Sequence, residues 1–119
     1  MIAIIFEVKP AEGKRDAYLA IAANLRATLE KMPGFISVER FQSITDPERM
    51  LSLSFWEDEE SVKGWRNLDV HRAAQARGRD SVFADYRLRV AGVIRDYGMH
   101  ERREQAPDDS PFKDNSNKI

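Results

Sequence analysis

Four polar residues in the second half of the chain recur at a spacing of four: Asn67, His71, Gln75 and Arg79. On a continuous helix this spacing places their side chains along one side. Imidazole titrates nearest to neutral pH, which makes His71 a candidate base for removing a phenolic proton. Asn67 and Arg79 are candidate anchors for the resulting anion, and the nearby Trp65 is a candidate wall of the site. A solvated helix face without a catalytic role is the alternative explanation.

Aromatic residues outside that stripe favour a cavity for a flat ring system. Trp56 closes a run of alternating strand residues, Phe41 lies in an earlier strand pattern, and Tyr86 lies in the last one. Aromatic walls suit a polycyclic ligand. We therefore predict that these three side chains bind the substrate, while ordinary core packing remains the alternative for each of them.

The composition of the chain excludes several classes of site. There are no cysteines, so disulfides, thiolate nucleophiles and cysteine-based zinc sites are ruled out. Only two histidines are present, and no metal site is predicted. Lys and Arg number 19 against 20 Asp and Glu, a formal net charge of -1. Neither nucleic acid nor a membrane surface is therefore an expected partner.

The hydropathy pattern favours a cytoplasmic protein. The longest purely apolar run is 2–6, far below the roughly 20 residues that a membrane span requires. A basic segment followed by an apolar stretch, the form of a secretory signal, is not found at the N-terminus. We expect a cytoplasmic location.

Hydrophobic periodicity predicts an alternation of strands and helices. Runs of β-branched or alternating apolar residues indicate strands, and apolar residues at steps of three and four indicate helices. The expected strands are 2–8, 35–43, 49–56 and 85–98, and the expected helices are 14–32, 58–65 and 67–79. Residues 1–98 form one expected domain. Residues 99–119 are a polar tail, whose expected place is on a partner subunit.

The order β-α-β-β-α-β predicts an α+β fold of the ferredoxin-like type. In this fold, helices cover one face of a four-stranded antiparallel sheet. We expect Met50 and Trp56 on the uncovered face, which is then too apolar to remain in water. Two such sheets packed face to face remove that exposure, so the sequence predicts a homodimer.

Two stretches of the chain resemble the antibiotic biosynthesis monooxygenase (ABM) domain family. The shorter is Met32-Pro33-Gly34-Phe35. The longer is Leu53-Ser54-Phe55-Trp56-Glu57-Asp58-Glu59-Glu60-Ser61-Val62, followed by Trp65 and His71-Arg72-Ala73-Ala74-Gln75. The resemblance covers roughly residues 1–98. It implies a dimeric α/β barrel, in agreement with the homodimer expected from the apolar sheet face.

The resemblance also implies an activity without a cofactor: oxidation of a phenolic, quinol or anthrone-like aromatic molecule by O₂, with His71 as base and Trp65 beside the substrate. A non-catalytic dimeric barrel that binds a small hydrophobic ligand is the alternative. Haem degradation, a third activity in the family, is disfavoured. That branch carries a haem-ligating His ten residues after the Trp and an Asn on the first strand, where this chain has Gln75 and, nearby, Phe6.

Overall fold

The computed structural model describes residues 1–100, so most of the predicted tail, 99–119, lies outside the described residues. Within this range no helix is both long and apolar enough to cross a membrane. The strands are β1 (Ile2–Pro10), β2 (Phe35–Gln42), β3 (Met50–Trp56) and β4 (Phe83–Gly92). The helices are α1 (Arg15–Leu29), α2 (Glu59–Arg66) and α3 (Asp69–Arg77), and α3 continues into a π-helical turn, η1 (Gly78–Val82).

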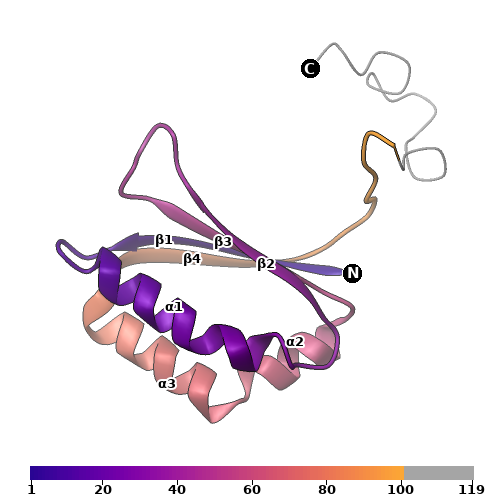
Figure 1. The fold of residues 1–119 in the computed structure, drawn as a ribbon, viewed down its shortest axis with the longest axis horizontal. Coiled ribbons are helices and arrows are strands. Elements are labelled where there is room, and N and C mark those ends of the chain that lie inside the picture. The colour runs from indigo at the N-terminus through magenta and orange to yellow at the C-terminus, as the bar shows by residue number, and fades with distance from the viewer. Residues whose placement is uncertain (101–119) are drawn as a thin grey trace.

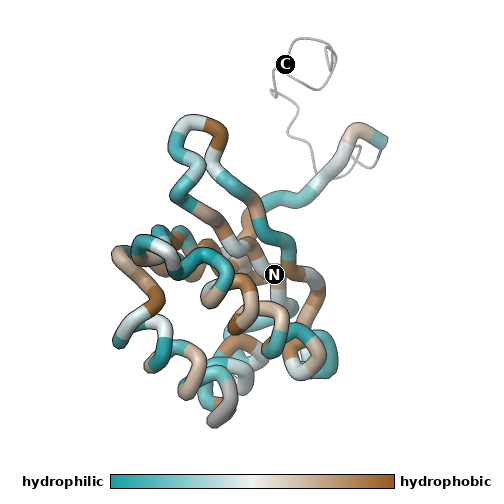
Figure 2. The backbone as a smooth tube through the Cα atoms, turned by 60° about the vertical axis from the view of Figure 1, so that its left-hand side comes forward, coloured by the Kyte–Doolittle hydropathy of each residue, from teal (hydrophilic) through white to brown (hydrophobic). Residues whose placement is uncertain are grey.

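The strands form one antiparallel sheet in the order β2-β3-β1-β4. This order confirms the predicted ferredoxin-like α+β fold. The helices gather on one face of the sheet and leave the other face bare (Figure 1). Hydrophobic stretches occur both along the strands and along the helices that cover them (Figure 2). This is the pattern of a core enclosed between two layers.

The residues of β3 that face the helices differ from those predicted. Met50 and Trp56 are 6% and 1% exposed and belong to core clusters that include helical residues. They therefore point to the helices, and their predicted place on the uncovered face is wrong. The uncovered face carries Leu51, Leu53 and Phe55 instead. Because both alternating sets in β3 contain large apolar residues, periodicity alone does not decide which set is covered.

Two clusters of buried side chains join the helices to the sheet. One contains Val8, Tyr18, Met50 and Val82, and the other contains Leu29, Trp56 and Val62. Each cluster contributes a residue of α1 to the cavity described below, Tyr18 from the first and Leu29 from the second. The packing that stabilises the fold therefore also positions the α1 side of the cavity.

Local hydrogen bonds fix the start of α2. The Asp58 carboxylate accepts hydrogen bonds from Ser61 N at 2.8 Å and from Ser61 Oγ at 2.7 Å. These bonds satisfy the free helix end and lower the pKa of Asp58. Ser61 also lies against Gly34, which has a φ of +80°, and a Cβ on Gly34 would come within 2.6 Å of Ser61 Cβ. Glycine is required there, and the close contact places α2, which carries Trp65.

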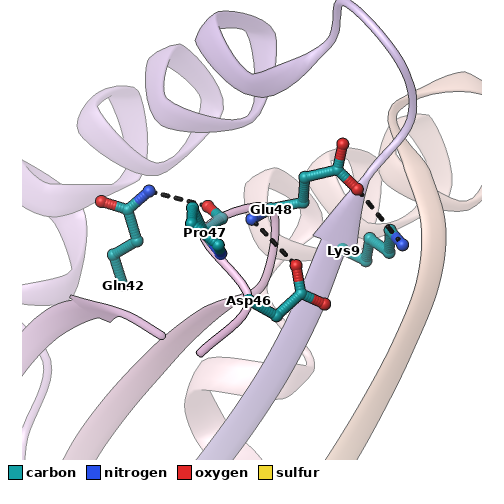
Figure 3. A network of polar contacts seen from close by, with 5 residues as sticks. All are labelled: Lys9, Gln42, Asp46, Pro47 and Glu48. Atoms are coloured by element: carbon teal, nitrogen blue, oxygen red, sulfur yellow. Dashed lines mark hydrogen bonds and ion pairs between the residues drawn. The ribbon is translucent and has the colours of Figure 1, made fainter. Parts of the chain in front are cut away.

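Polar groups close the turn between β2 and β3 (Figure 3). Gln42 Nε2 donates to the Pro47 carbonyl at 2.7 Å, and the Glu48 amide donates to Asp46 Oδ1 at 3.2 Å. An ion pair of 3.3 Å between Lys9 and Glu48 joins the turn to the end of β1. Exposed pairs of this kind contribute at most about 1 kcal/mol, so they orient the turn more than they stabilise the fold.

Two strand assignments differ from the prediction. β4 ends at Gly92 rather than at residue 98, because Gly92 already pairs with Ile2, the first residue of β1. In β2, Phe35 packs on Trp56 with ring centroids 5.4 Å apart, although alternation placed it on the face of Phe41. A register shift between Phe35 and Ser37 turns the Phe35 ring to the helix side.

Candidate active site

A cavity of about 360 Å³ lies between the sheet and the helices. All four strands contribute helix-facing side chains to it, among them Ile4, Val38, Ser52 and Leu88. The opposite side is formed by α1, α2, α3 and η1. The walls are mainly apolar, with a few polar groups aimed between them. That composition is typical of a site for a small organic molecule.

The break between α2 and α3 places Trp65 and His71 side by side. Leu68 adopts an extended conformation, with φ -68° and ψ 139°, and so separates the two helices. The ring centroids of Trp65 and His71 are 4.7 Å apart. Trp65 in turn stacks on Trp56 at 6.4 Å with an interplanar angle of 29°. The imidazole therefore packs on Trp65, which in turn packs on the buried Trp56.

One nitrogen of His71 is left without a hydrogen bond among the described residues. Both His71 and Trp65 line the cavity, and His71 Nδ1 is buried without a hydrogen-bond partner among the described residues. Burial lowers the pKa of His71, hydrogen bonding of the ring to the Arg66 backbone raises it, and the Arg66 charge lowers it further. The net shift is downward, so the ring is neutral at pH 7 and Nδ1 can accept a proton.

The lowered pKa of His71 predicts that the folded protein loses stability on mild acidification. The unfolded chain binds a proton near pH 6.5, whereas the folded chain binds it only at lower pH. The unfolded state therefore holds more protons in that window, and stability falls as pH drops from about 6.5 through the folded pKa. Urea unfolding at pH 7.5 and pH 5 measures this. His71→Gln should flatten the pH slope; an equal slope in the wild type and in His71→Gln would exclude His71 as the source.

The predicted stripe at a spacing of four holds only in part. His71, Gln75 and Arg79 all line the cavity, as they follow one another along α3 and η1. Asn67 does not line it, because it caps the C-terminus of α2, before the break at Leu68. The spacing aligns side chains only on a continuous helix, so the predicted anchor role of Asn67 is not supported by its position.

The π-helical turn η1 brings Arg79 to the cavity. A Cβ on Gly78 would overlap the Phe83 ring, so glycine allows η1 to lie against the start of β4. Phe83 and Tyr86 of β4 line the cavity together with Arg79. Short π-helical turns inside helices are frequent at functional sites. The predicted contributions of Arg79 and Tyr86 to the cavity agree with these positions.

Two of the aromatic residues predicted to bind the substrate, Phe41 and Trp56, are not among the residues that line the cavity. Phe41 is 41% exposed and pairs with Leu51 on the uncovered sheet face, so it is not among the cavity residues. Trp56 is 1% exposed and supports Trp65 from behind instead of lining the cavity. Phe41 lies on the uncovered face of the sheet, whereas Trp56 lies on the cavity side and is enclosed by core packing.

The cavity also contains a charged residue that the sequence analysis did not single out. Arg40 lines it from β2, and Arg40 Nε is buried without a hydrogen-bond partner among the described residues. Arg40 also forms a hydrogen bond with Tyr18, whose pKa is raised by burial and lowered by the Arg40 charge and by that bond. The available signal was the position of Arg40 two residues after Val38, which places a cation on the apolar side of a strand.

A family model described as "Antibiotic biosynthesis monooxygenase" (ABM) matches residues 1–77. The chain belongs to the antibiotic biosynthesis monooxygenase family. The resemblance inferred from the sequence motifs is thereby confirmed, and the ABM match includes α2 and α3, which carry Trp65 and His71.

Two relatives are similar to this chain over 93 residues each. A protein from Pyricularia oryzae named jasmonate monooxygenase ABM is 47% identical over 93 residues, which are 78% of this chain and 43% of the relative. This chain therefore spans less than half the length of that relative. Protein YqjZ from Bacillus subtilis, described as uncharacterized, is 29% identical over 93 residues, 78% of this chain and 79% of the relative.

Solved structures confirm the fold of the ABM domain. Rv0793 from Mycobacterium tuberculosis matches with a TM-score of 0.73 at 12% identity, covering 82% of this chain and 98% of that one. SO0527 from Shewanella oneidensis matches with a TM-score of 0.70 at 18% identity, covering 76% and 87%. At these identities the similarity concerns the fold alone. The family and the first relative together support a monooxygenase type of function.

Proposed function

We propose that this ABM-family protein is a cofactor-independent monooxygenase that oxidises a phenolic, quinol or anthrone-like molecule with O₂. The observation that carries the proposal is the position of His71 in the lining of a mainly apolar cavity, against Trp65 and with no hydrogen bond to Nδ1 among the described residues. A base in that state can take a proton from a bound ligand. The ABM family match and the relative named as a monooxygenase support the type of reaction.

The proposed reaction is written for an anthrone-like substrate with an acidic CH₂ group. His71 Nδ1 removes one proton, and the electron-rich anion passes one electron to O₂. The substrate radical and superoxide combine through a C–O bond to give a peroxide anion, which takes the proton back from His71. Loss of water then converts CH–OOH to C=O. The sum is CH₂ plus O₂ to C=O plus H₂O, which balances without another reductant.

The surroundings of His71 fit this sequence of steps. Trp65 supplies a flat apolar surface 4.7 Å from the imidazole, and Tyr86 contributes a second aromatic wall. The guanidinium of Arg79 stabilises the anion formed by deprotonation, because an opposite charge is effective in a site of low polarity.

Oxygen uptake tests the proposed function. The full chain, treated with a chelator, is mixed with anthrones, naphthols and hydroquinones, and with jasmonate because of the name of the relative. We expect uptake well above the autoxidation rate and one atom of ¹⁸O₂ in the product. Absence of uptake across the panel would overturn the proposal in favour of a non-catalytic barrel that binds a small hydrophobic ligand.

We infer further that the protein acts as a homodimer through the bare sheet face. On that face Leu51, Leu53 and Phe55 of β3 lie beside Phe41 of β2 and Ile5 of β1, as the strand register shows. A contiguous apolar surface of this kind is unfavourable in water and is typical of an interaction site. The dimer predicted from the sequence thus keeps its physical basis, with a different set of residues.

Leu53→Asp is expected to convert the dimer to a monomer, because two charges would be buried in a symmetric interface. Size-exclusion chromatography with light scattering measures the change as a halving of the mass. Ile44→Asp is the matched control, since Ile44 lies in the β2–β3 turn and is 97% exposed. A wild-type protein with the mass of a single chain would contradict the inference.

A further inference from the structure

The charged groups of the cavity all carry the same sign. Arg40, Arg66 and Arg79 line it, and none of the lining residues is an aspartate or a glutamate. The chain as a whole has a formal net charge of -1, so this excess of positive charge is local. Arginine remains charged at any physiological pH. The cavity is therefore apolar in its walls and cationic in its polar groups.

Within the part of the chain that the structure describes, Arg40 has no counter-ion of the kind that a partly buried guanidinium ordinarily has. Among residues 1–100, the ion pairs are Lys9–Glu48, Arg26–Glu30 and Glu7–Arg89, and none includes Arg40. Its Nε is buried, and no described residue forms a hydrogen bond with it. An unsatisfied buried donor costs roughly 1–3 kcal/mol, and more when it is charged. An anionic ligand in the cavity would supply the guanidinium with a counter-ion.

Two neutral hydroxyl groups lie close to Arg40. Tyr18 forms a hydrogen bond with Arg40 and keeps its own proton, because burial raises the pKa of the phenol. Its oxygen can accept from Arg40 while its O–H donates to a ligand. Ser52 pairs with Arg40 across β2 and β3 and lines the same cavity. A guanidinium with hydroxyl donors beside it is suited to a carboxylate.

We propose that Arg40 and Tyr18 bind the carboxylate of a hydrophobic acid, whose apolar body fills the rest of the cavity. This rests on the proposed function in one respect, that the cavity is the substrate site. It adds that the substrate is an organic anion before His71 acts. Arg40 would be a specificity-determining residue, because a buried polar site rejects the analogue that lacks the matching group.

Binding of an acid and its ester tests the proposal. The probes are 1-naphthaleneacetic acid and its methyl ester, which share their ring system and differ in charge. Tryptophan fluorescence of the wild-type full chain, with Trp65 in the cavity, reports both. We expect the acid to bind at least about tenfold more tightly than the ester, and this preference to shrink at high salt.

Variants locate the preference. Arg40→Met should abolish the preference for the acid over the ester, because it lowers the affinity for the acid and leaves that for the ester unchanged. Arg40→Lys should retain part of the preference, and Tyr18→Phe should reduce it by a smaller factor. Arg72→Met is the matched control, since Arg72 is exposed on α3 and does not line the cavity. The proposal would be overturned if the wild type bound acid and ester equally well or bound neither. It would also be overturned if Arg40→Met and Arg72→Met lost equal affinity for the acid.

This test does not depend on turnover. An Arg40-dependent preference for the acid without any oxygen uptake would support the anion site and reject the monooxygenase proposal. Uptake with neutral phenols and no preference for the acid would reject the anion site alone. If Arg40→Met fails to fold, the comparison of acid with ester in the wild type and in Arg40→Lys still decides.

Discussion

Replacement of His71 by alanine is expected to lower the rate of oxygen uptake by about 10²–10⁴-fold, the usual contribution of a positioned general base. The Nδ1 atom is the buried cavity nitrogen that can accept a proton, since the arginines lack a free lone pair and remain charged. Without it, the substrate must lose its proton to water in an apolar site. Stopped-flow or electrode measurements of uptake against substrate concentration give the effect on kcat and KM separately.

Two further variants show whether the lower rate of oxygen uptake comes from the loss of the base. His71→Gln keeps a polar side chain next to Trp65 but cannot take up a proton at neutral pH, so it should be as slow as the alanine variant. His100→Ala is the control, because His100 is exposed and lies beyond β4. Circular dichroism checks that each variant is folded. A folded His71→Ala protein with the wild-type rate would show that another group is the base.

Replacement of Trp56 by alanine is expected to reduce the free energy of unfolding by about 3–5 kcal/mol. Trp56 is 1% exposed, packs on Phe35 at 5.4 Å and on Trp65 at 6.4 Å, and donates its Nε1 to Ser54 Oγ at 3.1 Å. Alanine leaves an internal void and an unsatisfied hydroxyl. Thermal unfolding measures the change as a fall in Tm of at least about 12 °C.

The same substitution is expected to weaken ligand binding indirectly, because Trp65 loses the surface on which it stacks. Trp56→Phe retains most of the packing and loses only the hydrogen bond, so it should cost about 1–2 kcal/mol. Trp65→Ala is the matched control: Trp65 is only partly buried and lines the cavity, so it should affect binding more than stability. A loss below about 1 kcal/mol in Trp56→Ala would contradict its place in the core.

Much of the fold could be predicted because its signals are local. The helix stripe that includes Tyr18 and Leu29, the stop at Pro33-Gly34 and the cap at Asp58 each depend on neighbouring residues. The covered face of the sheet is a different matter. β3 has large apolar residues on both sides, and only the packing of α2 shows that Trp56 points inward. When both faces of a sheet are apolar, hydrophobic periodicity does not show which of the two faces the helices cover.

The candidate site was predictable where its residues share one helix. His71, Gln75 and Arg79 reach the cavity as their spacing indicated, and Trp65 joins them across the helix break. Asn67 and Phe41 do not, because a one-residue break and the choice of sheet face decide their directions. Arg40 was missed, since an arginine in a strand is ordinarily a surface residue. Its importance becomes visible only from its buried, unpartnered Nε.

In the proposed reaction His71 takes a proton from the bound substrate before oxygen reacts, and an anaerobic titration detects this step. Without O₂ the anion of an anthrone or naphthol accumulates and is seen by its absorbance. The wild-type full chain should form this anion on binding at pH 7, and His71→Gln should bind the substrate in its protonated form. A wild-type complex in which the substrate stays protonated, or equal amounts of anion in both proteins, would contradict the account.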